Sequence, residues 1–425
     1  MHNRRTNLPT DDQPSGPELY IPEPLYRPGD KPDFSHIHVR RSDNLERPDV
    51  LVDSYETERH AGGLIRVMNM NGDASGPWMP DISADTLRQG LRSMLTVRLM
   101  DDRMFAMQRQ GKLSFYLKSR GEEAISVAQA MAVRKSDMVF PTYRQQGILV
   151  ARNYPIKRMM CQCLSNAGDP GLGRQMPTMY SSREFGFFSI SGNLGTQFIQ
   201  AVGWAMASAY KNRDDLAMAY IGDGSTAEGD FHYALNFAST YRAPVILNIV
   251  NNQWAISSFQ GIAGGQSKTF ASRGLGYGLA CLRVDGNDFL AVYAVTRWAA
   301  ERARRGGGAT VIEHYTYRAE GHSSSDDPSK YRPLEEADAW PYGDPVERLK
   351  QHLIKIGEWS DEQHAELVEE LSVMVRETYK EAEALGSIAS GTGIDPKTMF
   401  EGVYEHMSPK LEEQAEISGV GSWRE

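Results

Sequence analysis

The stretch from Leu216 to Ser257 constrains the fold of this 425-residue chain more than any other part of it. It opens with a short apolar run, 216–221, that ends at Gly222-Asp223-Gly224, and it closes with a β-rich apolar run, 245–250, that ends at Asn251-Asn252. Their length and flanking residues are typical of buried strands. Between the two runs, four apolar residues share one helical face: Phe231, Ala234, Leu235 and Ala238.

The spacing inside this stretch predicts a strand, a helix and a second strand. Ser225 stands three residues before Glu228, as in a capping box, so we expect the helix to begin at Ser225. Two strands joined by one helix form a right-handed βαβ unit with parallel strands. The sequence therefore predicts an α/β fold with a mostly parallel sheet flanked by helices.

The two strand ends carry the polar residues. Because the carboxyl ends of parallel strands meet at one edge of a sheet, Asp223 and Asn252 are expected to lie together there. A carboxylate, an amide oxygen and nearby carbonyls suit Mg²⁺, which keeps its other positions for water and phosphate oxygens. Gly222 and Gly224 would let the backbone approach a diphosphate closely, and the helix start offers free N–H groups to it.

A nicotinamide-binding turn is the main rival interpretation, because residues 222–227 fit the dinucleotide fingerprint G-x-G-x-x-A. That fingerprint needs an acid at the end of the second strand to bind a ribose, and this chain has Asn251-Asn252 there. Asp223 inside the turn would also repel a pyrophosphate unless a cation lay between them. A metal–diphosphate site accounts for both features.

Gly222-Asp223-Gly224, followed by 26 residues and then Asn251-Asn252, resembles the thiamine diphosphate motif. From Asp81 to the C-terminus the chain resembles alpha subunits of branched-chain (2-oxoisovalerate) 2-oxo acid dehydrogenases of bacterial type. The resemblance implies the thiamine diphosphate-binding fold, with thiamine diphosphate and Mg²⁺ as cofactors. It also implies oxidative decarboxylation of branched-chain 2-oxo acids and acyl transfer to a lipoyl domain. The expected partners are a beta subunit, in an α₂β₂ heterotetramer, and a lipoyl-bearing acyltransferase core.

The same resemblance assigns roles to single residues. Tyr143 and Arg144 would hold the diphosphate, Gly192 and Leu194 would contact the aminopyrimidine ring, and Trp254 would add a backbone carbonyl to the metal. His322 is the expected catalytic residue beside the cofactor, and Phe115 with Leu194 would line the substrate pocket. The turn around the diphosphate contributes Gly222, Gly224, Ser225 and Glu228.

A potassium ion is implied at the turn before a helix expected over 196–210, through Ser191, Asn193, Thr196 and Gln197. A plain helix N-cap explains those residues equally well. The chain departs from the family's pattern at Val250, where relatives often have a phosphate-binding arginine. Either another cation compensates for this arginine, or the cofactor is held more weakly. Residues 173–177 resemble the branched-chain type, but a pyruvate dehydrogenase alpha subunit and a non-catalytic subunit that retains the fold stay as alternatives.

Composition narrows the class of protein further. A net charge of −9 argues against a nucleic-acid partner, and no apolar run approaches the 18 residues of a membrane span. The N-terminus lacks an apolar signal core, so a cytoplasmic location is expected. Three domains are predicted: an extended arm with a short hairpin (1–80), the cofactor-binding α/β domain (81–345) and a helical C-terminal region (346–425).

Overall fold

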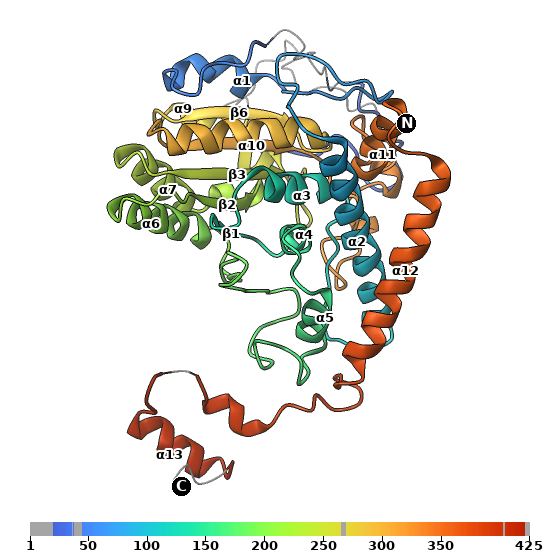
Figure 1. Cartoon of the computed structure of the whole chain (residues 1–425), viewed down its shortest axis with the longest axis vertical. Helices are drawn as coiled ribbons and strands as arrows, with labels where there is room; N and C mark the ends of the chain where they lie inside the picture. Colours follow the sequence, from blue (N-terminus) through green and yellow to red (C-terminus); the bar gives the residue numbers. More distant parts are fainter. Residues whose placement is uncertain (1–19, 36, 38–44, 265–268, 403, 421–425) are drawn as a thin grey trace, which may run out of the picture.

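A five-stranded parallel sheet forms the centre of the molecule in the computed structural model, which describes residues 20–35, 37, 45–264, 269–402 and 404–420. The strand order is β1-β2-β3-β7-β6, and every neighbouring pair is parallel (Figure 1). The strands are β1 (Met138–Phe140), β2 (Ala217–Gly222), β3 (Val245–Asn251), β6 (Ala280–Asp285) and β7 (Thr310–Tyr315). The predicted α/β fold is confirmed, and the runs at 216–221 and 245–250 are neighbouring strands.

Helices cover both faces of this sheet, which is why all seven residues of β3 are buried. One face packs against α3 (Glu123–Ala132) and α10 (Phe289–Arg304). The opposite face packs against α6 (Thr196–Tyr210), α7 (Gly229–Thr240) and α9 (Ser272–Leu275). Successive side chains of a strand point to opposite faces, so each core takes alternate residues of the same strands.

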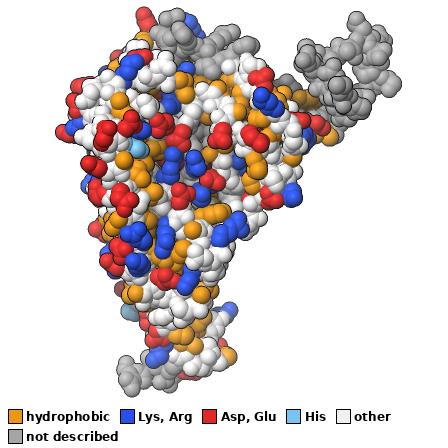
Figure 2. Space-filling model, turned by 90° about the vertical axis from the view of Figure 1, so that its right-hand side faces the viewer, with side chains coloured by type: hydrophobic (Ala, Val, Ile, Leu, Met, Phe, Trp, Pro, Cys, Tyr) orange, Lys and Arg blue, Asp and Glu red, His pale blue; other side chains and the backbone are white. Residues whose placement is uncertain are grey.

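An outer helical layer lies on the α3 side of the molecule. Ser83 caps α2 (Ala84–Arg109) by accepting from the backbone N–H of Thr86. The layer also contains α4 (Gln146–Ala151), α5 (Ile156–Leu164), α11 (Pro345–Lys355) and α12 (Asp361–Glu383). Helix α12 buries residues at four-residue spacing, Leu367, Leu371, Val375 and Tyr379, along α2 and α5. Seen from this side, acidic and basic side chains intersperse with apolar ones (Figure 2).

The segment before α2 contains two short helices, η1 (Ser54–Thr57) and α1 (Glu58–Gly62), although an extended arm was predicted. The predicted hairpin is reduced to one antiparallel bridge, Met68 with Ala74, around the turn at Gly72 (φ +80°). The carboxylate of Asp288 holds this segment on the sheet by accepting from the backbone N–H groups of Val67 and Met68, both at 2.7 Å. Part of the predicted arm lies outside the described residues, and the domain limits stay a prediction.

The turn after β2 differs from the prediction. Residues Gly224–Ala227 form a 3₁₀ turn, η2, and the helix α7 begins only at Gly229. Ser225 makes no capping bond to a helix; the hydroxyl and N–H of Thr226 instead bond the carbonyl oxygen of Asp223 (2.6 and 3.2 Å). Because these hydrogen bonds form a separate turn before the helix, the predicted helix start at Ser225 is wrong by four residues. The predicted apolar face of the helix is confirmed, since all four residues are buried.

The remaining elements are short. They are β4 (Trp254–Ala255), β5 (Ser258–Phe259), α8 (Gly261–Gly264), η3 (Pro328–Lys330), η4 (Leu334–Glu336), η5 (Pro396–Phe400) and α13 (Pro409–Ile417). The last two lie on a segment that leaves the main body (Figure 1). Asn166 anchors its start by donating to the carbonyl oxygens of Ala382 and Gly386. Within the part of the chain that the structure describes, none of the helices combines the length and apolar character needed to cross a membrane.

Candidate functional site

Asp223 and Asn252 follow adjacent strands and lie at the same edge of the sheet. Gly222 pairs with Val250 across β2 and β3, and the backbone N–H of Asp223 donates to the carbonyl oxygen of Val250 at 3.2 Å. Both side chains line one cavity of about 500 Å³. The predicted convergence of these two residues is therefore confirmed, and it follows from the parallel pairing of their strands.

Most of the other predicted site residues line the same cavity, although they come from distant segments. They are Tyr143, Arg144, Gly192, Leu194, Gly222, Gly224, Ser225, Glu228, Trp254 and His322. Phe115 does not line it; this half-buried residue precedes Tyr116, whose backbone N–H donates to the Ser324 hydroxyl and whose carbonyl oxygen accepts from the Ser324 N–H, two residues beyond His322. Its role in a substrate pocket stays a prediction.

The Asp223 carboxyl has the surroundings of a cation ligand. It is 2% exposed, and its Oδ2 atom has no hydrogen-bond partner. Burial raises the pKa of this carboxyl to about 7, because desolvation penalises the charged form. A buried carboxylate with an unused oxygen is costly unless a cation pairs with it. Within the described residues no three His, Cys, Asp or Glu side chains form a metal cluster, so an ion here would depend on amide and backbone oxygens as well.

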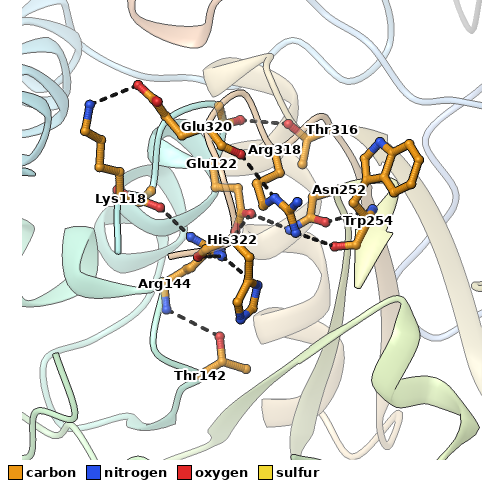
Figure 3. A network of polar contacts seen from close by, with 12 residues as sticks. Lys118, Glu122, Thr142, Arg144, Asn252, Trp254, Thr316, Arg318, Glu320 and His322 are labelled. Atoms are coloured by element: carbon orange, nitrogen blue, oxygen red, sulfur yellow. Dashed lines mark hydrogen bonds and ion pairs between the residues drawn. The ribbon is translucent and has the colours of Figure 1, made fainter. Parts of the chain in front are cut away.

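The Asn252 and Trp254 groups are already oriented by the protein (Figure 3). The Asn252 amide nitrogen donates to Glu122 Oε1 at 2.6 Å, and its Oδ1 lies 3.3 Å from the backbone N–H of Trp254. The carbonyl oxygen of Trp254 accepts from Arg318 Nη1 at 3.0 Å. A carbonyl oxygen has two lone pairs, so this contact leaves one of them for a metal. The predicted oxygen set thus fits Mg²⁺ in its donor chemistry.

The glycines of the turn have different surroundings. A Cβ on Gly224 would come within 2.2 Å of the Ala255 Cβ, so β4 can pack against the turn only if residue 224 has no side chain. A Cβ on Gly222 would meet no heavy atom within 4 Å, because Gly222 faces open space in the cavity. Of the two glycines, Gly222 leaves space for a ligand such as a diphosphate beside its backbone, whereas Gly224 is required by the packing of β4.

Arg144 is the one arginine or lysine among the described residues that line the cavity. It is 4% exposed, and its guanidinium donates to the carbonyl oxygens of Lys118 (2.5 Å) and His322 (2.6 Å). Tyr143 lies beside it, with the guanidinium carbon 5.5 Å from the ring centroid. Val250, which is 3% exposed, also faces the cavity and brings no charge to it. A phosphate group here would therefore depend on Arg144.

His322 is held in one tautomer by its neighbour. Arg144 Nη2 lies 3.2 Å from His322 Nδ1, and because a guanidinium only donates, Nδ1 must accept. The proton of the neutral ring is then on Nε2. Burial, followed by the charges of Arg144 and Arg318, lowers the pKa of His322 to about 3. The neutral ring can therefore donate one hydrogen bond, through Nε2, to an acceptor in the cavity.

The lowered pKa of His322 predicts a pH dependence of stability. The unfolded chain binds a proton on this residue below about pH 6.5 and the folded chain does not, so stability is present above that pH and is lost as pH falls toward 3. We expect the thermal midpoint of the cofactor-free protein to fall between about pH 7 and 5, and to fall less in His322→Gln. The same change at the exposed His406 is the control; an equal effect of both substitutions would contradict the prediction.

The turn predicted to bind potassium lies next to the cavity, and its four residues are not part of the cavity lining. The backbone N–H of Asn193 donates to Ser191 Oγ (3.1 Å), and Thr196 Oγ1 donates to the Asn193 carbonyl oxygen (2.9 Å). Gln197 donates to the Tyr220 carbonyl oxygen, while its own Oε1 is buried without a partner. The helix α6 begins at Thr196 as predicted, with Gly195 as its N-cap and no side-chain cap. The unpaired Gln197 oxygen fits a cation; occupancy stays a prediction.

Two residues that orient the proposed metal ligands were not predicted from the sequence. Glu122 lies at the N-cap of α3, is 2% exposed and faces the cavity. Arg318 lies behind the cavity, where it donates to the carbonyl oxygens of Trp254 and Ile256 and to the Tyr331 hydroxyl. Two adjacent acids at a helix start, Glu122 and Glu123, were the available signal for the first. Nothing in the sequence alone connects Arg318 with residue 254.

The chain matches known protein families over most of its length. Residues 91–389 match the family model described as "Dehydrogenase E1 component", and residues 15–55 match "2-oxoisovalerate dehydrogenase E1 alpha subunit N terminal". The chain is 56% identical over 402 residues to the 2-oxoisovalerate dehydrogenase subunit alpha of Pseudomonas aeruginosa, covering 95% of this chain and 98% of that protein. The mitochondrial alpha subunits of Mus musculus and Homo sapiens are 37% and 36% identical, over 91% of this chain and 85% and 84% of theirs.

Proposed function

The chain belongs to the dehydrogenase E1 component family, and from this premise we propose that it is the alpha subunit of a branched-chain 2-oxo acid dehydrogenase. The reaction proposed is the thiamine diphosphate-dependent oxidative decarboxylation of branched-chain 2-oxo acids, with transfer of the acyl group to a lipoyl domain. The convergence of Asp223, Asn252, Arg144 and His322 on one cavity is the observation that supports this most directly. It argues against a non-catalytic subunit that keeps only the fold.

Each of these residues has a role in the proposed reaction. Asp223, Asn252 and the Trp254 carbonyl would hold Mg²⁺, and Arg144 with Tyr143 would hold the diphosphate. The thiazolium ring of thiamine diphosphate supplies the electron sink that decarboxylation of a 2-oxo acid needs. His322 would hold its Nε2 proton toward the reacting acyl group or a phosphate oxygen. Leu194, which is 38% exposed at the cavity, would support the aminopyrimidine ring.

The apolar rim of the cavity supports a beta subunit that covers it. Leu194, Ile256 and Ile262 line the cavity and are 38%, 55% and 59% exposed. Exposed apolar groups around a site mark a surface that another protein covers. In the proposed assembly the beta subunit closes this rim, keeps water out and supplies the remaining catalytic groups.

A second apolar surface supports an α₂β₂ arrangement. Tyr233 and Phe237 on α7 and Tyr241 at its C-cap form one stripe at four-residue spacing, and they are 62%, 43% and 59% exposed. This stripe is separate from the cavity lining, so it offers a second interface. Native mass spectrometry of the co-purified subunits should give the mass of two alpha and two beta chains. A lipoyl-bearing acyltransferase core as the further partner and a cytoplasmic location stay proposals.

A substrate panel on the assembled enzyme tests the proposed function. We expect lipoamide-dependent turnover of 2-oxoisovalerate and 2-oxoisocaproate to require thiamine diphosphate and Mg²⁺, and to exceed that of pyruvate. Preference for pyruvate would support the pyruvate dehydrogenase alternative instead. No cofactor binding and no turnover with a beta subunit would support a non-catalytic role. The alpha chain alone should show no steady turnover.

A further inference from the structure

Two consecutive asparagines at the end of β3 are each held by a different buried glutamate. The amide nitrogen of Asn251 donates to Glu313 Oε1 on β7 at 2.9 Å, and that of Asn252 donates to Glu122 Oε1 at 2.6 Å. Glu313 is fully buried and also bonds Arg283 and the backbone N–H of Ala271, away from the cavity. Glu122 lines the cavity. The chain therefore contains two similar Asn–Glu hydrogen bonds, and only the one between Asn252 and Glu122 lies at the cavity.

The contact with Glu122 decides which end of the Asn252 amide faces the proposed metal. An amide has a donor end and an acceptor end, and only the oxygen binds Mg²⁺. With its nitrogen on Glu122, the amide turns its oxygen toward the backbone N–H of Trp254, the residue whose carbonyl oxygen is the third proposed ligand. Rotation of the amide by half a turn would place two acceptor oxygens 2.6 Å apart and would lose that hydrogen bond.

Glu122 itself is rigidly placed. Although it stands at the N-cap of α3, its side chain makes no capping bond and instead lies between Asn252 and Arg144, whose Nε is 3.8 Å away. The preceding Gly121 has φ +98°, and a Cβ there would be 2.1 Å from the Tyr317 carbonyl oxygen. The Gly121 carbonyl oxygen also accepts from Thr316 Oγ1 at 2.7 Å. Figure 3 shows Glu122 between Arg144 and Asn252.

We propose that Glu122 is a positioning residue for the metal site, which fixes the Asn252 amide with its oxygen available to Mg²⁺ and holds Arg144 beside it. This inference rests on the proposed function, because it concerns the same cofactor. It assigns no bond between Glu122 and the metal. Partners that orient a metal ligand typically change metal affinity by about 10- to 100-fold when they are removed.

The test measures Mg²⁺ binding rather than turnover. The assembled enzyme is titrated with Mg²⁺ by calorimetry at saturating thiamine diphosphate. Two variants are compared: Glu122→Met removes the hydrogen-bond acceptor at similar side-chain volume, and Glu122→Gln retains an acceptor oxygen. We expect about 10- to 100-fold weaker binding in Glu122→Met and a change below about threefold in Glu122→Gln. Glu313→Gln is the matched control for a lost buried charge and should bind Mg²⁺ normally.

An exchange of partners gives a second test that does not depend on the folding of Glu122→Met. Asn252→Asp places a second carboxylate against Glu122, so the two groups repel each other and we expect Mg²⁺ binding to be weaker than in the double variant that removes this repulsion. The double variant N252D/E122Q restores a donor–acceptor pair with reversed polarity, and it should regain about tenfold in affinity. Recovery would support the positioning role. No recovery, normal binding by Glu122→Met, or equal losses in Glu122→Met and Glu122→Gln would overturn it.

Failure of this inference and failure of the proposed function give different results. If the wild-type enzyme binds Mg²⁺ and thiamine diphosphate but the Glu122 variants bind them equally well, only the positioning role is wrong. If the wild-type enzyme with its beta subunit binds neither, the proposed function is wrong, and the role of Glu122 falls with it. Binding of thiamine diphosphate by the wild type is therefore measured first.

Discussion

Replacement of Asp223 by asparagine is expected to lower kcat/KM of the assembled enzyme for 2-oxoisovalerate by about a thousandfold, which corresponds to ~4 kcal/mol of transition-state stabilisation. The reason is the loss of the buried charge at the proposed metal site, where Oδ2 has no protein partner. The asparagine has the same shape but cannot neutralise Mg²⁺. Turnover and calorimetric binding of Mg²⁺ with thiamine diphosphate are the two measurements.

Stability of the metal-free protein separates loss of the metal from loss of the fold in this variant. The Asp223 carboxyl has a pKa raised by burial to about 7, so its ionisation destabilises the metal-free protein as pH rises through that range. An asparagine side chain at this position has no such cost, so metal-free Asp223→Asn should unfold at a temperature no lower than the wild type at about pH 8. Asp230→Asn, at the nearby first turn of α7 and outside the cavity lining, is the control. Wild-type Mg²⁺ affinity in Asp223→Asn would contradict the proposed site.

Replacement of Arg144 by lysine is expected to weaken thiamine diphosphate binding by about 100-fold, or ~3 kcal/mol, the size of one or two charged hydrogen bonds. Arg144 presents a planar fork that already bonds Lys118 and His322 through their carbonyl oxygens, and a lysine cannot make these bonds and reach a phosphate together. The loss should be large because Val250 offers no compensating charge, and because Arg144 is the one permanent cation among the described cavity-lining residues.

The control for Arg144→Lys is Arg120→Lys. Arg120 is 49% exposed, pairs with Glu320 at 3.7 Å and lies outside the cavity, so its replacement should leave thiamine diphosphate binding unchanged. The measurement is the dissociation constant of thiamine diphosphate at saturating Mg²⁺. An affinity of Arg144→Lys within about threefold of the wild type would show that another group holds the diphosphate.

The sequence was most informative where the structure depends on local pattern. Apolar runs of strand length, with glycines or asparagines at their ends, identified β2 and β3 to within one residue at each end. The helix α6 also begins and ends at the predicted residues, and the buried face of α7 follows from helical periodicity. The start of α7 was misplaced because a 3₁₀ turn satisfies the same backbone groups that a capping box would satisfy.

Contacts between distant residues were decided by the tertiary structure. The order β1-β2-β3-β7-β6 places β7 beside β3. The loop that follows β7 and contains His322 therefore lies at the same edge of the sheet as Asp223 and Asn252. Glu122 and Asn252 are 130 positions apart, and Arg318 and Trp254 are 64 apart. The tautomer of His322 depends on a single atom of Arg144. No periodicity or motif spacing in the sequence indicates any of these contacts.

The sequence by itself determined the elements and the residue types at their ends, because hydrophobic periodicity and turn chemistry act over a few neighbouring residues. It also identified twelve of the residues that line the cavity: the motif at the two strand ends pointed to six of them, and the resemblance to a known family supplied the other six, Tyr143, Arg144, Gly192, Leu194, Trp254 and His322. The tertiary structure decided which atoms of those residues are free, which are already bonded and which buried neighbours orient them. Hydrogen-bond direction and desolvation depend on the packing of segments that are far apart in the chain, and that packing exists only in the folded protein.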